Sequence, residues 1–309
     1  MGKEKRGKRQ CRSMVQNILK KQYPRLMSFQ TLIRGDEARS HLDDPRWVFV
    51  DCRFTLSDPG RGEAEYLRSH VRGAVYAHLD RDLSGPVVPG VTGRHPLPSV
   101  DAAAAALGGL GIQRGVQVVA YDASTGAVAA ARLWWLLKWL GHEEAAVLDG
   151  GFSRWTEAGL PCADGRQIRA RARFEPAPRP ELLVDVDTVL EIRADPGWAL
   201  LDVRSGDRFH GKNETIDPVA GHIPGARSAP YMDSLRQDGT FRGRDELARL
   251  FTSATGGQDA SRTVFYCGSG VTAAHSVLAA AHGGCGMARL YAGSWSEWIS
   301  DPRRPIATE

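Results

Sequence analysis

Short apolar runs alternate with longer stretches of helical periodicity along most of the chain. Four such runs predict buried strands, at residues 47–50, 116–121, 198–201 and 263–266. Helices are predicted over 124–141, with Ser124 as N-cap and Gly141 as stop signal, and over 272–284, which ends in two glycines. Strands that alternate with helices are typical of an α/β fold, in which helices cover both faces of a parallel sheet.

The same blocks of sequence occur twice, in the same order and at a separation close to half the chain. Four matched blocks in one order indicate a tandem duplication. The pairs are WVFVDCR (47–53) with WALLDVR (198–204), HVRGAVYAHLD (70–80) with HIPGARSAPYMD (222–233), GVQVVAYDASTGAVAAARLWW (115–135) with RTVFYCGSGVTAAHSVLAA (262–280), and VLDGGFSRW (147–155) with RLYAGSWSEW (289–298).

The length of 309 residues fits two domains of about 150 residues each. We place the first domain at 27–162 and the second at 184–309. The segment between them, 163–183, is rich in proline and arginine and lacks apolar periodicity, so we predict a linker there.

Basic side chains crowd residues 1–26, where Glu4 is the only acidic residue. Because the whole chain carries a formal net charge of +4, the rest of it carries a net negative charge. A basic arm can bind nucleic acid or an acidic surface, but here the charges are not interleaved with aromatic side chains. We therefore predict a disordered N-terminal arm and expect no nucleic-acid partner.

The sequence contains neither an apolar run of membrane-spanning length nor the apolar core of a secretory signal. The cysteines are odd in number and widely spaced, and no Cys-x-x-Cys pair occurs, which disfavours a disulfide framework and a structural zinc site. We predict a cytoplasmic protein in a reducing compartment, with no membrane partner and no metal. The five cysteines are Cys11, Cys52, Cys162, Cys267 and Cys285.

One cysteine follows a predicted strand and precedes a glycine-rich turn into a helix, in the segment Cys267–Thr272. Gly268 and Gly270 permit backbone conformations in which successive N–H groups point inward as an anion-binding nest. The start of the helix adds positive potential, which favours the thiolate over the thiol. Hydroxyl groups of Ser269 and Thr272 add donors. The pattern predicts a nucleophilic sulfur in a cradle for a negatively charged partner.

The first half of the chain contains the same segment without the cysteine. Asp122 stands at the position of Cys267 and is followed by Ala-Ser-Thr-Gly. A carboxylate is not a sulfur nucleophile, and its charge would repel an anion. We therefore predict that the first domain is catalytically silent and forms one wall of the site.

The sequence resembles the tandem-domain rhodanese family, which comprises thiosulfate and 3-mercaptopyruvate sulfurtransferases. The resemblance extends from about Met27 to Pro305 and rests on DGGFSRW, DVR, GHIPGA, CGSGVTA and GSWSEW, in this order. It implies two tandem α/β domains, each a parallel sheet flanked by helices, with an inactive first domain, a catalytic second domain and a site between them.

The resemblance also implies roles for individual residues. Cys267 corresponds to the nucleophile that carries the transferred sulfur as a persulfide, and Gly268, Ser269, Gly270, Val271 and Thr272 correspond to the active-site loop. Arg208 corresponds to the arginine that binds the anionic group of the donor, for which its planar fork is suited. Ser269 corresponds to a residue that helps protonate the leaving group, although a simple hydrogen bond within the loop would also explain it.

The implied reaction transfers a sulfane sulfur from thiosulfate or 3-mercaptopyruvate to a thiophilic acceptor by a ping-pong mechanism. The acceptor is cyanide in an assay and a thiol, such as thioredoxin or a low-molecular-weight thiol, in the cell. No cofactor is required. The preferred donor stays open, because the neutral Gly-Ser-Gly loop is typical of the mercaptopyruvate branch while residues 213–220 lack the second arginine of that branch.

Two other functions are compatible with a strand, a cysteine loop and a helix. One is a non-catalytic or sulfur-carrier module of the rhodanese fold, which the intact Cys267 loop disfavours. The other is a cysteine phosphatase or arsenate reductase, which requires an arginine where this chain has Ala273.

Several polar and aromatic residues recur in both halves, including the silent one, and are therefore interpreted as structural. His70 and His222 are expected to bind a backbone group in an H-x-x-G-A turn. The other pairs are Asp51/Arg53 with Asp202/Arg204, and Trp155 with Trp298. Phe54 is expected to pack against the sulfur pocket or in the core.

Overall fold

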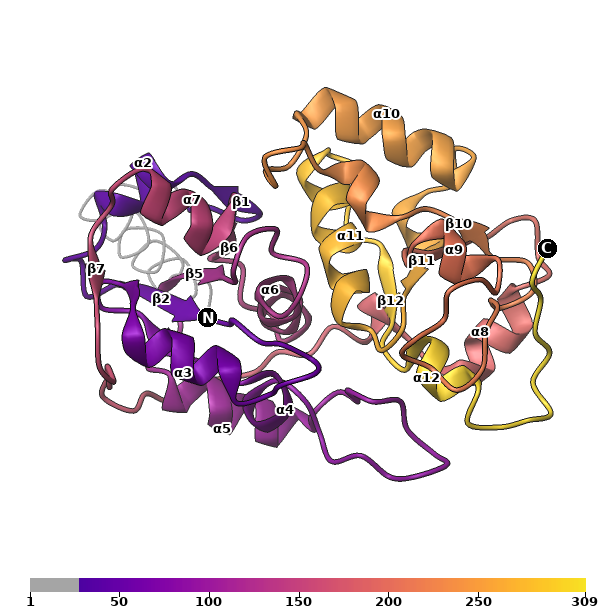
Figure 1. The fold of residues 1–309 in the computed structure, drawn as a ribbon, viewed down its shortest axis with the longest axis horizontal. Helices are drawn as coiled ribbons and strands as arrows, with labels where there is room; N and C mark the ends of the chain where they lie inside the picture. Colours follow the sequence, from indigo (N-terminus) through magenta and orange to yellow (C-terminus); the bar gives the residue numbers. More distant parts are fainter. Residues whose placement is uncertain (1–27) are drawn as a thin grey trace, which may run out of the picture.

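The computed structural model describes residues 28–309, so the predicted arm at 1–26 lies outside the described residues. Two lobes lie side by side, the N-terminal one indigo to magenta and the C-terminal one orange to yellow (Figure 1). Within the described range, no helix has the length and apolar character needed to cross a membrane.

The N-terminal lobe contains a five-stranded parallel sheet with the strand order β1-β6-β5-β2-β4. Successive residues of β2 face opposite sides: Val48 and Val50 join one apolar cluster, and Trp47 and Phe49 join another. The sheet is therefore buried on both faces. Its strands are β1 (Leu32–Ile33), β2 (Trp47–Asp51), β4 (Val75–Tyr76), β5 (Gln117–Tyr121) and β6 (Ala145–Leu148).

The C-terminal lobe repeats this topology. Its parallel sheet has the order β10-β9-β11-β12-β8, which is the N-terminal order read from the other edge. Its strands are β8 (Leu183–Val184), β9 (Ala199–Asp202), β10 (Arg227–Ser228), β11 (Thr263–Tyr266) and β12 (Arg289–Tyr291). The predicted strands at 47–50, 116–121, 198–201 and 263–266 are therefore present as β2, β5, β9 and β11, and they occupy equivalent places.

The helices cover the two sheets in corresponding ways. Side chains of α5 and α6, and of α10 and α11, contribute to one large apolar cluster, whereas α2 and α7, and α8 and α12, pack on the opposite faces. The N-terminal helices are α2 (Gly35–Arg39), α3 (Arg61–Arg68), α4 (Leu79–Asp82), α5 (Val100–Gly109), α6 (Ala130–Trp139) and α7 (Gly151–Glu157). The C-terminal helices are α8 (Val186–Ile192), α9 (Gly206–Phe209), α10 (Arg244–Thr255), α11 (Val271–His282) and α12 (Ser294–Trp298), with short 3-10 turns at Pro180–Leu182, Tyr231–Ser234 and Ala260–Arg262.

The predicted helix at 272–284 is present as α11, but the prediction for 124–141 was wrong at its start. Helix α6 begins only at Ala130, and Ser124 does not cap it. The Asp122 carboxylate accepts hydrogen bonds from the N–H groups of Ser124, Gly126 and Val128, which holds this stretch as a loop. The predicted end of this helix agrees better with the structure, because α6 ends at Trp139, shortly before the predicted stop at Gly141.

The two lobes share one apolar interface. Helix α6 packs against α11, and every residue of α6 is buried. A helix that is buried all round needs apolar neighbours on every side, and α6 finds them in both lobes. The side chains of Thr31 and His282 add a hydrogen bond of 2.9 Å across the boundary. This interface fixes the N-terminal lobe against the edge of the C-terminal sheet where Cys267 lies.

The segment after the N-terminal lobe is bound to that lobe by backbone hydrogen bonds. The N–H groups of Gly165, Ala172 and Ala177 donate to carbonyls of Leu67, Gly108 and Leu140. A short antiparallel pair of β3 (His70–Val71) and β7 (Cys162–Ala163) begins this segment. The chain then enters the C-terminal lobe at Pro180.

Candidate active site

The Cys267 loop, residues 267–270, connects the end of β11 to the start of α11. Gly270 has a φ of 76°, and a Cβ atom there would overlap the carbonyl oxygen of Ala292. Only glycine fits this turn, which points the start of α11 toward the loop. Cys267 is 3% exposed. The predicted order of strand, cysteine, turn and helix is present, with Val271 and Thr272 in the first turn of α11.

A second turn, between β12 and α12, holds the backbone of Cys267. The Cys267 N–H donates to Ser294 Oγ at 3.0 Å, and that hydroxyl donates to the Tyr291 carbonyl at 2.9 Å. Ser294 has a φ of 55°, which is uncommon for a residue other than glycine. Such strain persists where the surrounding contacts determine the position, as these two hydrogen bonds do.

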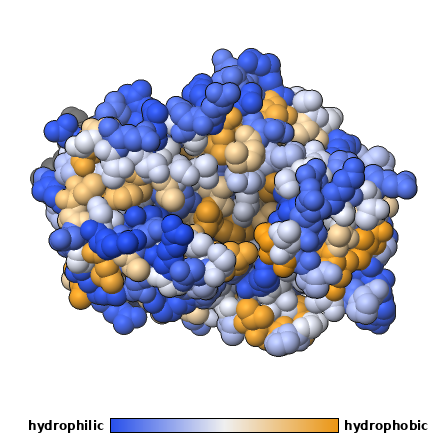
Figure 2. All heavy atoms as spheres, viewed as in Figure 1, coloured by the Kyte–Doolittle hydropathy of each residue, from blue (hydrophilic) through white to orange (hydrophobic). Residues whose placement is uncertain are grey.

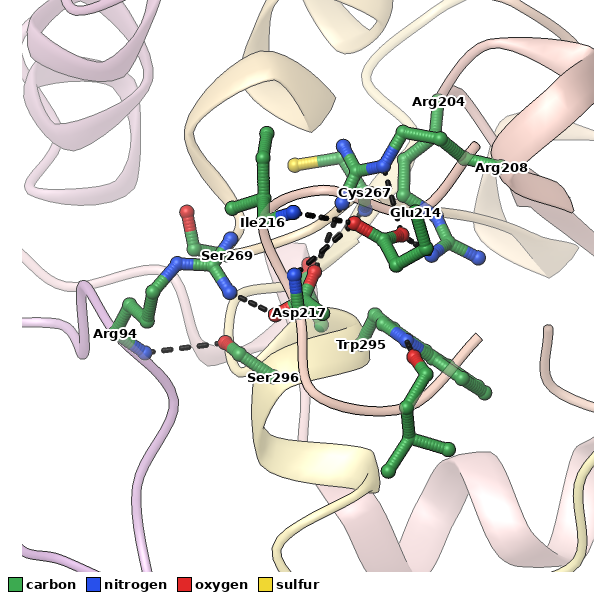
Figure 3. Close-up of polar contacts among 12 residues, drawn as sticks. Arg94, Arg204, Arg208, Glu214, Ile216, Asp217, Cys267, Ser269, Trp295 and Ser296 are labelled. Atoms are coloured by element: carbon green, nitrogen blue, oxygen red, sulfur yellow. Dashed lines mark hydrogen bonds and ion pairs between the residues drawn. The ribbon is translucent and has the colours of Figure 1, made fainter. Parts of the chain in front are cut away.

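Charged side chains gather beside the loop (Figure 3). Arg208, on the short helix α9, donates from Nε to Glu214 and from Nη2 to Asp217, each at 2.8 Å. Arg94, from the N-terminal lobe, also pairs with the Asp217 carboxylate. The Asp217 side chain is fully buried, and its burial raises its pKa although both arginines oppose the shift. Burial also acts on Glu214, but the hydrogen bond and charge of Arg208, together with the backbone N–H groups of Ile216 and Asp217, outweigh it and lower the pKa of Glu214.

Ser269 contacts a histidine from the other lobe. Its Oγ lies 2.7 Å from His95 Nδ1, and His95 Nε2 lies 3.3 Å from Asp80 Oδ1. Burial, helped by the charges of Arg132 and Arg94, lowers the pKa of His95 to about 4, so the ring is neutral at pH 7. With Nε2 protonated toward Asp80, Nδ1 accepts the hydrogen bond of the Ser269 hydroxyl. The three groups form a chain of polar contacts that ends at the Cys267 loop.

Arg132 brings a positive charge into the boundary between the lobes. It lies on α6, its side chain is fully buried, and it donates to the carbonyls of Gly270 at 3.3 Å and His95 at 2.8 Å. Burial lowers its pKa to about 10, and the nearby Cys267 opposes that shift when it carries negative charge. A buried guanidinium bound to carbonyls is stabilised by a neighbouring anion, and the Cys267 thiolate can supply one.

One face of the molecule is hollowed and partly apolar. Figure 2 shows hydrophobic residues gathered in a hollow near the middle of the face, between the two lobes, with hydrophilic residues around it. Phe54 is buried in the same apolar cluster as Cys267 and meets the His95 ring edge-on, with centroids 6.3 Å apart. Sites of this kind combine apolar walls with a few polar groups that orient a ligand.

The model of the rhodanese-like domain matches the chain twice, over residues 35–158 and 185–301. The chain belongs to the rhodanese family. A Pseudomonas aeruginosa relative, provisionally named 3-mercaptopyruvate sulfurtransferase, is 46% identical over 91% of this chain and 99% of its own length. A Mycobacterium tuberculosis relative, provisionally named thiosulfate sulfurtransferase, is 40% identical over 83% of this chain and 89% of its own. The structure of 3-mercaptopyruvate sulfurtransferase from Leishmania major is 34% identical, with a TM-score of 0.78 over 89% of this chain and 75% of that one.

These similarities confirm the expected family, the tandem α/β fold and the enzyme class, a sulfurtransferase. A sulfurtransferase requires a sulfur donor and an acceptor. The residues predicted for this rhodanese site are close together in space: Arg208 lies beside the Cys267 loop, with its Nη2 atom 3.5 Å from the position of a Cβ atom on Gly268 (Figure 3).

Sequence reasoning missed the residues that the N-terminal lobe adds. Asp80, Arg94, His95 and Arg132 all belong to the lobe that was expected to be silent. One signal was available: the stretch 84–98 is rich in glycine and proline yet contains an arginine and a histidine side by side. Long loops without regular structure often carry function.

The recurring residues are structural, as predicted. His70 Nδ1 contacts the Tyr66 carbonyl at 2.8 Å, and His222 Nδ1 contacts the Phe209 carbonyl at 2.7 Å. The remaining pairs behave alike: Asp51 with Arg53 and Asp202 with Arg204 form buried ion pairs within their own domains, and Trp155 and Trp298 are buried in the two cores.

Proposed function

We propose that this rhodanese transfers sulfane sulfur from a small anionic donor to a thiol through a persulfide on Cys267. The main support is the position of Cys267, at the end of a parallel strand, in a glycine loop before a helix and beside two arginines. Loop N–H groups and the helix N-terminus stabilise negative charge on sulfur.

In the first half-reaction, the Cys267 thiolate attacks the outer sulfur of the donor. A bond forms between the two sulfur atoms, and the bond from the donor sulfur to the rest of the donor breaks. Thiosulfate then leaves as sulfite, which keeps the electron pair and needs no proton. With 3-mercaptopyruvate, the electron pair goes to carbon and the product leaves as the enolate of pyruvate, which must take up a proton.

Ser269 and His95 support 3-mercaptopyruvate as the preferred donor. The thiol of 3-mercaptopyruvate supplies this proton: the Ser269 hydroxyl can pass it to the neutral His95 ring, which Asp80 orients, and then return it to the enolate carbon, so that the persulfide is left as an anion. This proton path has no use with thiosulfate. The names of the Pseudomonas aeruginosa and Leishmania major proteins agree with this donor, while the name of the Mycobacterium tuberculosis protein gives thiosulfate.

In the second half-reaction, an acceptor thiolate attacks the outer sulfur of the persulfide, and Cys267 leaves as the thiolate. We propose thioredoxin or a low-molecular-weight thiol as the cellular acceptor, in the reducing cytoplasm, and cyanide replaces it in an assay to give thiocyanate. Because Cys267 is nearly buried, the acceptor thiol must reach the persulfide below the protein surface.

The test is a steady-state assay with each donor and cyanide, on the full chain and on Cys267→Ala. We expect turnover that depends entirely on Cys267, with kcat/KM for 3-mercaptopyruvate at least about tenfold higher, which is about 1.4 kcal/mol in transition-state binding. The exposed Cys162 provides the matched control, since Cys162→Ala should keep full activity. Turnover in Cys267→Ala would refute the persulfide, and a preference for thiosulfate would refute the donor.

A further inference from the structure

The loop between α4 and α5, residues 83–99, extends from the N-terminal lobe toward α12 of the C-terminal lobe (Figure 1). Its two sides are joined where the Gly85 N–H donates to the Pro96 carbonyl at 2.8 Å. At the far lobe, the Arg94 N–H donates to Ser296 Oγ at 3.1 Å. A Cβ atom on Gly93 would lie 2.5 Å from the carbonyl oxygen of Gly293, so the two backbones are in close contact. The loop therefore places Arg94 at a defined position.

Arg94 and Arg208 reach the same point beside the nucleophile. A Cβ atom built on Gly268, the residue next to Cys267, would lie 2.9 Å from Arg94 Nη2 and 3.5 Å from Arg208 Nη2. The Asp217 Oδ2 atom lies 3.6 Å from the same point. Two guanidinium groups from different domains thus meet around one carboxylate (Figure 3).

A ligand can reach the guanidinium groups of Arg94 and Arg208 but not the carboxylate of Asp217. The side chains of Arg94 and Arg208 are 30% and 17% exposed, whereas the side chain of Asp217 is fully buried. The Nε atom of Arg94 is buried and has no hydrogen-bond partner among residues 28–309, which leaves it a donor to satisfy. Both guanidinium groups can therefore bind a further anion while Asp217 holds them in place.

The charges of this cluster cancel. Three arginines face three carboxylates through direct ion pairs: Arg94, Arg204 and Arg208 against Asp202, Glu214 and Asp217. Without excess positive charge, the cluster binds an anion by directed N–H groups rather than by net attraction. A doubly charged anion costs much more to desolvate than a singly charged one, and a balanced cluster does not offset the difference.

Resting on the proposed sulfur transfer, we propose that Arg94 and Arg208 form one subsite for the donor's anionic group, and that Asp217 restricts it to a singly charged carboxylate. Arg94 is then a specificity-determining residue contributed by the non-catalytic domain. The singly charged 3-mercaptopyruvate fits this subsite, whereas thiosulfate brings two charges.

The test combines donor kinetics with direct binding of pyruvate, the product that retains the carboxylate, measured by titration calorimetry. We expect Arg94→Ala to raise KM for 3-mercaptopyruvate about tenfold or more, with kcat within about twofold, and to weaken pyruvate binding by a similar factor. Arg94→Lys should recover part of the loss, because the charge remains and the fork is lost. Arg114→Ala, at an exposed arginine of the same domain, is the matched control.

Asp217→Asn tests the restriction on charge. The variant gives the cluster a net positive charge, so the ratio of kcat/KM for thiosulfate to that for 3-mercaptopyruvate should rise about tenfold. Thermal unfolding of each variant checks the fold. An unchanged ratio in a folded Asp217→Asn overturns the role of Asp217.

The binding measurement separates this inference from the proposed function. Pyruvate binding that is undetectable in the unaltered protein, or equal in Arg94→Ala, overturns the subsite even if sulfur transfer is normal. Binding that depends on Arg94 supports the subsite even if neither donor is turned over, and in that case the proposed reaction fails alone.

Discussion

The loops that follow β5 and β11 share a backbone framework and differ in the side chain at its centre. In each domain, two consecutive N–H groups of the helix after the neighbouring strand, α7 or α12, donate to the first two carbonyls of the loop, at 2.9 to 3.0 Å. The donor and acceptor pairs are Phe152 with Asp122 and Ser153 with Ala123 in the N-terminal domain, and Trp295 with Cys267 and Ser296 with Gly268 in the C-terminal domain.

At the centre of the N-terminal loop, Asp122 binds the loop's own backbone. Its carboxylate accepts N–H groups of Ser124, Gly126 and Val128 at 2.8 to 3.2 Å, so the anion-binding nest is filled by an anion from within the chain. Cys267 places a thiol at the corresponding position. The comparison teaches that the same backbone framework holds either a carboxylate bound by the loop's own N–H groups or a thiol, which we propose carries the transferred sulfur.

The N-terminal domain is nevertheless part of the site. It supplies His95 to Ser269, Arg94 to Asp217 and Arg132 to the Gly270 carbonyl. In the proposed reaction, duplication thus separates two tasks: the C-terminal domain keeps the nucleophile, and the N-terminal domain supplies charged and proton-carrying groups from the facing side.

Exchanging the central residues should have the largest effect. Cys267→Asp makes the second loop like the first, and we expect sulfur transfer to fall to the rate without enzyme, because a carboxylate cannot form the persulfide. Adding Asp122→Cys should not restore activity, since Arg208 and Arg94 lie only beside the C-terminal loop. Thiocyanate formation measures both variants, and recovery in the double variant would show that the N-terminal loop is competent for catalysis.

Replacing His95 tests the contribution of the N-terminal domain to proton transfer. His95→Gln can keep a hydrogen bond to Ser269 but cannot carry a proton, so kcat with 3-mercaptopyruvate should fall about 10²- to 10⁴-fold. With thiosulfate kcat should stay within about threefold, because sulfite leaves without a proton.

The pH dependence sharpens the same prediction. The pKa of His95 is lowered to about 4, so the ring is neutral above that value and becomes charged below it. The part of kcat that depends on His95 should therefore persist through mildly acidic pH and be lost as the pH approaches about 4. Equal losses with both donors in His95→Gln would indicate a purely structural role.

Removing the carboxylate that fills the N-terminal nest should have the smallest effect on activity. Asp122→Ala leaves three backbone N–H groups without their acceptor, which we expect to lower the free energy of unfolding by about 1–3 kcal/mol. Donor kinetics should not change. Urea unfolding measures the effect, with the exposed Asp101→Ala as control. A loss of activity at unchanged stability would assign Asp122 to the site.

The fold could be read from the sequence because its signals are local and repeated. The strands β2, β5, β9 and β11 were visible as apolar runs, and the repeated blocks gave the domain organisation. The start of α6 could not be read, because the Asp122 carboxylate competes for the backbone N–H groups that a helix needs. That competition depends on the conformation of the loop rather than on residue type.

The sequence by itself determined the family, the duplicated α/β fold and the position of the cysteine between strand and helix, since each is carried by neighbouring residues. Only the tertiary structure decided which residues surround that cysteine. Four of them lie far from Cys267 along the chain: Asp80, Arg94, His95 and Arg132. Each is a charged or polar residue of a type that is common on protein surfaces, so its type alone does not mark it as part of a site. The packing of α6 against α11 and the contact of Gly93 with Gly293 bring them to the loop, where burial and nearby charge give them their chemistry.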